Sequence, residues 1–198
     1  MMKRLPIAAA VLVLSTLPAF AHLDPGEHGS FLAGFTHPLT GLDHILVMVA
    51  VGLWAATIGG RALWVVPAAF VGTMGAGYLL SLTGVALPAV EPVILASVVA
   101  LGLVVAMAVK LPPAAAAVLV GVFALFHGHA HGGEIGAATA ASFGFGFAIA
   151  TALLHAAGLG LGIALGRGLG FGEIAGKAIA RILGAGAAVV GLVLAFGG

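Results

Sequence analysis

The sequence predicts an all-α integral membrane protein, a compact bundle of six transmembrane helices that follows a cleaved N-terminal signal peptide. Of the 198 residues, 62% are hydrophobic and only 7% are charged, so the chain cannot build the polar shell of a soluble domain. Its apolar residues fall into separate runs, each near the ~20 residues that a bilayer requires. Short connections between these runs leave no room for a soluble domain.

The first 21 residues have the pattern of a secretory signal peptide, with an uncleaved anchor as the alternative. Lys3 and Arg4 form a positive n-region, the apolar run 7–17 is short for a span, and residues 19–21 (Ala-Phe-Ala) form a cleavage site. Cleavage would leave residues 22–36 as a short periplasmic segment. His22 would then carry a free α-amine beside its imidazole, which makes it a secondary candidate for metal binding.

Residues 37–198 are expected to form the transmembrane domain. We place its six spans at about 39–58, 62–82, 92–109, 113–131, 135–165 and 174–196; the fifth is over-long and must tilt, kink or end early. Arg61, Lys110 and Arg167 fall in alternate loops, whereas the opposite connections contain no Lys or Arg. Because basic loops face the cytoplasm, both ends of the mature chain should be periplasmic, in a bacterial inner membrane.

Ionisable side chains concentrate in the segment 35–48 (FTHPLTGLDHILVM). Pro38 fits the first turn of a helix, with His37 capping it or just outside. On one helix a stripe would then form, with Asp43 beside it: His37, Gly41, His44 and Met48. Imidazoles, a carboxylate and a thioether suit a divalent transition metal. The alternative is a capping histidine next to a buried Asp–His pair.

A second cluster lies in the segment 125–134 (LFHGHAHGGE), at the same predicted membrane face. His127, His131 and Glu134 share a helical face, while His129 points roughly the other way. Histidine-rich tracts can also bind metal unspecifically at a surface. Weaker candidates are Met74, one turn after Phe70, and His155, deep in the fifth span.

Composition excludes several functions. The chain has no cysteine, so a metal must be held by nitrogen, oxygen or thioether. A net charge of +1 gives no reason to expect a nucleic-acid partner. The sequence around Gly176 and Lys177 is not a Walker A motif, which argues against an ATPase.

Both clusters resemble the motifs of the HupE/UreJ family of bacterial nickel permeases. HPLTGLDH matches its H-x5-D-H signature and FHGHAHGGE matches F-H-G-x-A-H-G-x-E. The resemblance implies secondary transport of Ni²⁺, or of Co²⁺, as substrate, with no permanently bound cofactor. It also implies an indirect link to a nickel enzyme, hydrogenase or urease. The matching positions are His37, Asp43, His44, His127, His131 and Glu134; His129 falls at a variable position.

The chain is therefore expected to be a transporter rather than an enzyme, with the metal ion and the lipid bilayer as partners. Two alternatives remain open. An intramembrane Zn²⁺-dependent hydrolase could use the same side chains, although neither H-E-x-x-H nor G-x-S-x-G occurs. A passive membrane metal-binding protein is the other.

Overall fold

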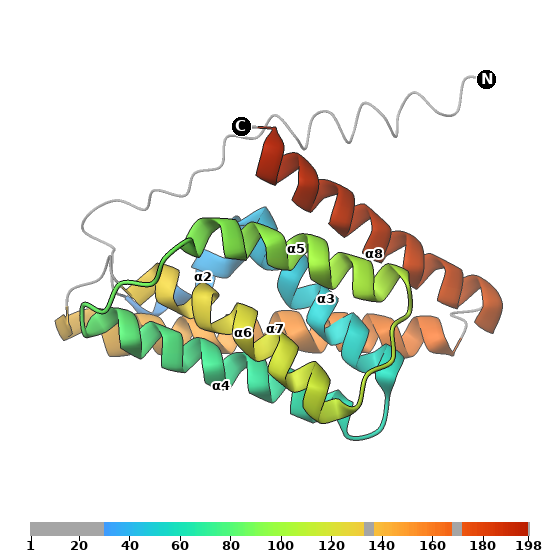
Figure 1. Cartoon of the computed structure of the whole chain (residues 1–198). Helices are drawn as coiled ribbons and strands as arrows, with labels where there is room; N and C mark the ends of the chain where they lie inside the picture. The colour runs from blue at the N-terminus through green and yellow to red at the C-terminus, as the bar shows by residue number, and fades with distance from the viewer. Residues whose placement is uncertain (1–29, 133–136, 168–171, 198) are drawn as a thin grey trace, which may run out of the picture.

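The computed structural model describes residues 30–132, 137–167 and 172–197. Within these ranges the chain forms seven α-helices and no strand (Figure 1). Their bounds are α2 Phe31–Thr40, α3 Leu42–Ile58, α4 Ala62–Leu82, α5 Val90–Ala106, α6 Pro113–Gly132, α7 Ala137–Gly166 and α8 Glu173–Phe196. The predicted signal peptide, His22 and Glu134 lie outside the described residues.

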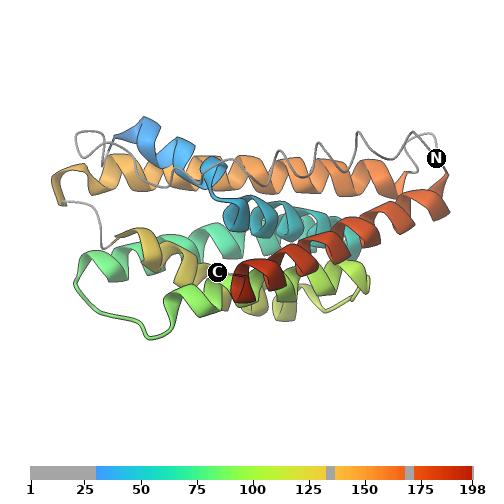
Figure 2. The same ribbon diagram turned by 90° about the horizontal axis from the view of Figure 1, so that it is seen from above.

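The helices lie side by side, with α3 at the centre of the bundle (Figures 1 and 2). α3 touches every other helix except α6 among the principal contacts, and its middle, from Val47 to Ala55, is almost wholly buried. The most extensive helix pairs are α4–α6, α5–α8, α3–α7 and α2–α7. The short helix α2 lies over the first part of α7 (Figure 2).

Each of these four pairs is brought together by glycines on both helices. A Cβ at any of them would overlap backbone of the partner helix, so only glycine permits the observed approach. The reciprocal glycines are Gly34 and Gly146 for α2–α7, Gly52 and Gly158 for α3–α7, Gly77 and Gly128 for α4–α6, and Gly102 and Gly184 for α5–α8. The abundance of glycine in this apolar chain thus serves close packing of helices.

Many large apolar side chains point away from the bundle, for example Trp64, Val118, Ile174 and Phe196. Four described helices, α4, α6, α7 and α8, are long and apolar enough to cross a membrane. α2 and α3 together pass the same test as one broken span, bent by 84°. This architecture is that of an all-α membrane protein.

The first and third predicted spans differ most from the helices observed: the first is divided between α2 and α3, and the third ends early. α5 ends at Ala106, before the predicted residue 109, because Ala108 adopts a left-handed conformation (φ 51°) and Pro112 and Pro113 follow. With 17 residues α5 is shorter than the four helices that are each long enough to cross a membrane. The over-long fifth segment forms one continuous helix of 30 residues, about 45 Å, without a break.

The two ends of the bundle differ in chemistry. The α3–α4 and α5–α6 connections lie together at one end and the α4–α5 connection at the other (Figure 1). The first end, which we call the basic end, holds Arg61, Lys110, Arg167 and the start of α8. There Arg181 donates a hydrogen bond from Nε to the carbonyl of Ala106 at the end of α5 (2.8 Å). The opposite end, which we call the histidine end, holds the predicted clusters.

Candidate metal site at the histidine end

The first cluster is split between two helices, so the prediction of one continuous stripe is wrong. His37 and Pro38 belong to α2, and α3 begins only at Leu42. The chain turns at Gly41, which is extended (φ −88°, ψ 118°) and caps α3. A Cβ at Gly41 would lie 2.9 Å from Asp43 Oδ1 and 3.2 Å from His44 Nδ1. Glycine at the bend therefore leaves space for these two side chains to fold back.

Asp43 orients the imidazole of His44 at the start of α3. Asp43 Oδ2 lies 3.1 Å from His44 Nδ1, and His44 is 5% exposed. An ionised carboxylate can only accept a hydrogen bond, so Nδ1 of His44 carries the proton and donates it. The other nitrogen of a neutral His44, Nε2, then presents its lone pair. This carboxylate–imidazole arrangement is the one that typically supports a metal-bound histidine.

His131, on the last turn of α6, meets His44 across the bundle. The two Nε2 atoms lie 2.8 Å apart, and the ring of His37 is 4.3 Å from that of His131. His127, one turn earlier on α6, places its ring 5.0 Å from His44. These four side chains, which we call the histidine cluster (His37, His44, His127 and His131), come from the consecutive helices α2 and α3 and from α6, which is distant in sequence.

Ser97 on α5 fixes the tautomer of His127. The Ser97 hydroxyl donates its single proton to the carbonyl of Ile94 (2.6 Å), so Oγ can only accept from His127 Nε2 (3.0 Å). His127 is therefore protonated on Nε2 and carries its lone pair on Nδ1. That Nδ1 atom is buried and has no hydrogen-bond partner in the part of the chain that the structure describes. A buried lone pair without a donor is costly unless something else binds it.

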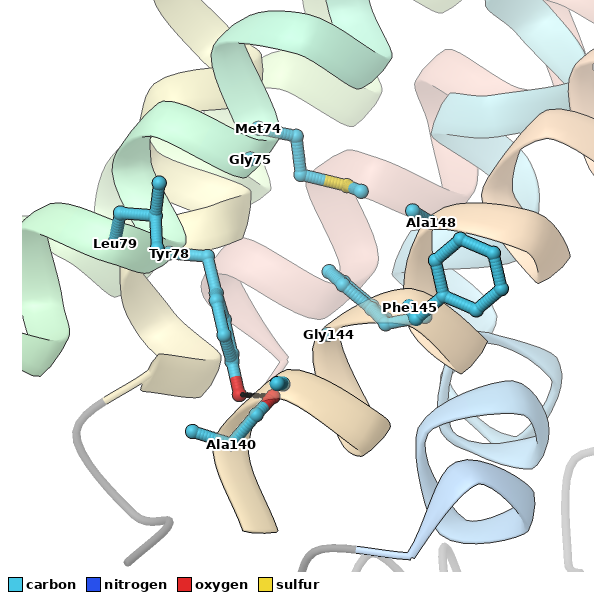
Figure 3. A pocket seen from close by; sticks show the side chains of 10 residues that line it. Met74, Gly75, Tyr78, Leu79, Ala140, Gly144, Phe145 and Ala148 are labelled. Carbon is cyan, nitrogen blue, oxygen red and sulfur yellow. Dashed lines mark hydrogen bonds between the residues drawn. The ribbon is translucent and has the colours of Figure 1, made fainter. Parts of the chain in front are cut away.

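Three aromatic rings border the cluster. Phe147 on α7 lies 5.1 Å from the ring of His131, and it also lines a cavity of about 270 Å³ between α4 and α7, shown in Figure 3. Phe143, one turn earlier on α7, lies 5.8 Å from the ring of His37, and Phe70 on α4 lies 5.7 Å from the ring of His127. These rings give the cluster apolar walls, beside which electrostatic interactions are stronger than in water.

The cluster does not form a ready coordination sphere. Among the described residues, no group of three or more His, Asp or Glu side chains is arranged to hold a metal ion as it stands. In the His44–His131 contact the lone pair of His44 Nε2 accepts the proton of His131 Nε2, and a cation would have to replace this hydrogen bond.

The remaining predicted residues lie elsewhere. His129 donates a hydrogen bond from Nε2 to the carbonyl of Val85 in the α4–α5 connection (2.6 Å) and does not join the cluster. Met48 is fully buried in the core, one turn after His44. Met74 on α4 and His155 on α7 are also buried, and they lie further from the histidine end, where α4 packs against α7.

Sequence reasoning missed Ser97 and Phe147. No motif marks either residue, because each meets the histidines only through packing of distant helices. The one available signal for Ser97 was general: a buried histidine requires a polar partner, and serines are few in this chain.

Comparison with known proteins shows the family. The model of the HupE / UreJ protein family matches residues 9–194. The chain belongs to the HupE/UreJ family. A relative, Protein HupE of Rhizobium leguminosarum bv. viciae, is 52% identical over 135 residues, which cover 68% of this chain and 70% of that protein. No solved structure gives a significant match.

HupE/UreJ proteins are of the transporter type, linked to nickel and cobalt transport and to an accessory role for hydrogenase. Membership therefore relates this membrane protein to nickel metabolism. The match includes both histidine segments, the helices α2 to α7 and all but the last two residues of α8.

Proposed function

We propose that this protein is a secondary transporter that imports Ni²⁺, with Co²⁺ as the second candidate, from the periplasm to the cytoplasm. The single observation that carries the proposal is the convergence of four imidazoles from α2, α3 and α6, centred on the 2.8 Å contact between His44 and His131. Family membership supports nickel over other metals, because nitrogen and oxygen ligands alone do not select it.

In this proposal the entering ion displaces the hydrogen bond between His44 and His131. His131 loses its Nε2 proton and takes up a proton on Nδ1 by exchange with water, so that the ring stays neutral and offers Nε2 to the ion. His44 offers Nε2 because Asp43 holds its Nδ1 proton, and His127 offers Nδ1 because Ser97 accepts its Nε2 proton. Neutral imidazoles supply lone pairs but no negative charge, and an uncompensated dication in a low-dielectric bundle is costly. Asp43 therefore supplies one negative charge and Glu134 the other.

Transport needs no ATP in this account. An inside-negative membrane potential drives a divalent cation inward with about 4.6 kcal/mol per 100 mV. That corresponds to a concentration ratio above about a thousandfold. The protein thus acts as a permease and has no catalytic turnover of its own.

The proposed topology is an inner-membrane protein with six spans and a cleaved signal peptide. The basic end of the bundle would face the cytoplasm, since Lys and Arg accumulate on that side. The histidine end and both mature termini would face the periplasm, where the ion is captured. The imported metal would serve a nickel enzyme, as suggested by the hydrogenase link of the family.

The test is uptake of radiolabelled ⁶³Ni²⁺ into proteoliposomes with an imposed inside-negative potential, with Co²⁺, Zn²⁺ and Cu²⁺ as competitors. We expect potential-dependent uptake that Co²⁺ inhibits more strongly than Zn²⁺ does. Protein-free liposomes and the His44→Ala variant serve as controls. Potential-dependent uptake no greater than in protein-free liposomes would contradict the proposal.

A further inference from the structure

His155 is a buried imidazole inside the bundle. It is 1% exposed, and neither of its ring nitrogens has a hydrogen-bond partner among the described residues. Leaving buried polar atoms unsatisfied costs about 1–3 kcal/mol each, so native proteins rarely keep them without a reason. Binding of a cation or a water molecule to this imidazole would remove that cost.

The surroundings of His155 continue the histidine cluster inward. The ring of Phe70 contacts both His155 (ring centres 5.0 Å apart, edge to face) and His127 (5.7 Å). Within the described residues, the buried side-chain nitrogen and oxygen atoms that lack hydrogen-bond partners all belong to His127 and His155. The rings that carry these atoms therefore both contact the ring of Phe70.

The packing of α4 against α7 places the thioether of Met74 at a level between the histidine cluster and His155. Phe70 faces His155, and one turn along each helix Thr151 donates a hydrogen bond to the sulfur of Met74 (3.6 Å). His155 follows Phe147, which borders the cluster, by eight residues, so it lies about 12 Å further along α7, toward the basic end.

Met74 has the chemistry of a transient ligand. It is fully buried, and its flexible side chain extends beside Ala148 at the wall of the cavity between α4 and α7 (Figure 3). The thioether is polarisable and keeps a second lone pair while it accepts the hydrogen bond from Thr151. Imidazole and thioether together suit a borderline divalent transition-metal ion.

We propose that His155 forms an inner binding station that the divalent metal ion occupies after it leaves the histidine cluster, with Met74 as a transient ligand at the level between them. This inference deepens the proposed transport function and rests on it. An inner station with few ligands binds weakly, and conduction requires sites that an ion can leave as well as enter. The histidine cluster captures the ion, and the inner station carries it past the apolar middle.

The first experiment separates capture from passage. Full-length His155→Ala and Met74→Leu proteins are measured for ⁶³Ni²⁺ binding by equilibrium dialysis and for uptake into proteoliposomes. We expect initial uptake by His155→Ala to fall by about tenfold or more, as for loss of a metal-supporting group, while equilibrium binding changes less than about threefold. Met74→Leu, which keeps the volume, should show a smaller fall in uptake. His129→Ala is the matched control and should change neither quantity.

Wild-type uptake by His155→Ala would overturn the inner station while leaving the proposed transport function intact. A parallel loss of binding and uptake would also overturn it, because His155 would then support the cluster or the fold. Absence of uptake by the wild-type protein would instead contradict the proposed function itself.

The second experiment detects the ion at position 155 directly. The natural chain has no cysteine, so His155→Cys introduces a unique thiol. We expect Co²⁺ or Ni²⁺ to produce a thiolate-to-metal charge-transfer absorption in this variant. Ala150→Cys, a buried position about 140° around α7, is the control and should stay silent. No absorption in folded His155→Cys at metal concentrations that saturate the cluster would contradict the proposal.

Discussion

The histidine cluster and His155 differ in how their ring nitrogens are held. In the cluster, Asp43 fixes one nitrogen of His44 and Ser97 fixes one nitrogen of His127. His155 has neither kind of support, and both of its nitrogens are free. Orienting partners pre-organise lone pairs for capture, whereas an unsupported imidazole binds more weakly. We therefore expect the histidine cluster to capture the ion and His155 to bind it only transiently during passage.

The largest expected effect comes from removing the centre of the cluster. His44→Ala should reduce Ni²⁺ uptake to the background of protein-free liposomes, because His44 contacts the rings of His37, His127 and His131. His127→Ala should have a similar effect. Uptake and membrane content are measured together, with His129→Ala as the control. Equal losses for all three variants would contradict the separation of His129 from the cluster.

The next effect tests charge compensation at the cluster. Asp43→Asn keeps the size of the side chain but removes the negative charge and changes the partner of His44 Nδ1. We expect uptake to fall by about 10- to 100-fold. Glu134→Gln should also lose most transport if it supplies the second charge. The measurement is the initial rate of uptake at varied external Ni²⁺ concentration and matched protein content. Wild-type rates in both the Asp43 and the Glu134 variants would show that other groups compensate the charge of the ion.

The third effect is on pH dependence. Histidines bind metal only when neutral, and protonated imidazoles also repel the dication. Uptake should therefore be highest above the ordinary imidazole pKa of about 6.5 and fall by about tenfold as external pH drops one to two units below it. The measurement is initial uptake from pH 8 to pH 5 at constant membrane potential. A rate that keeps rising under acid would indicate proton-coupled import instead.

The smallest effect sharpens the role of Ser97. Ser97→Ala removes the oxygen that accepts the hydrogen bond from His127 Nε2. The proton of His127 is then no longer held on Nε2, and its lone pair is no longer fixed on Nδ1. We expect Ni²⁺ affinity to fall by up to about tenfold, the lower end of the range for a partner that orients a ligand. Ser97→Thr, which retains the hydroxyl, should restore affinity. Failure of the threonine variant to bind better than alanine would argue for a packing role only.

Much of the fold could be predicted because apolar runs and turn residues act locally. Ala62–Leu82 was predicted and observed with the same bounds, and the two histidine segments were expected at one end of the bundle. The structure brings together four of the six principal site residues as one cluster, with Asp43 in contact with it.

The rest depended on contacts between distant segments. The turn at Gly41 was not predicted, because Pro38 is compatible with the first turn of a helix as well as with its later position in α2. What favours α2 is the close packing of Gly34 and Gly146 at the α2–α7 interface. The same limit applies to Ser97, whose bond to His127 joins α5 to α6.

The most direct test of the central claim is X-ray absorption at the Ni edge of the purified full-length protein. If the histidine cluster receives the ion, the spectrum of wild-type protein with one equivalent of Ni²⁺ should show scattering from at least three imidazoles, drawn from the four rings that converge here. His131→Ala should lose one imidazole and His129→Ala none. An ion surrounded mainly by water oxygen, with the same spectrum in His131→Ala, would contradict a metal site between α2, α3 and α6.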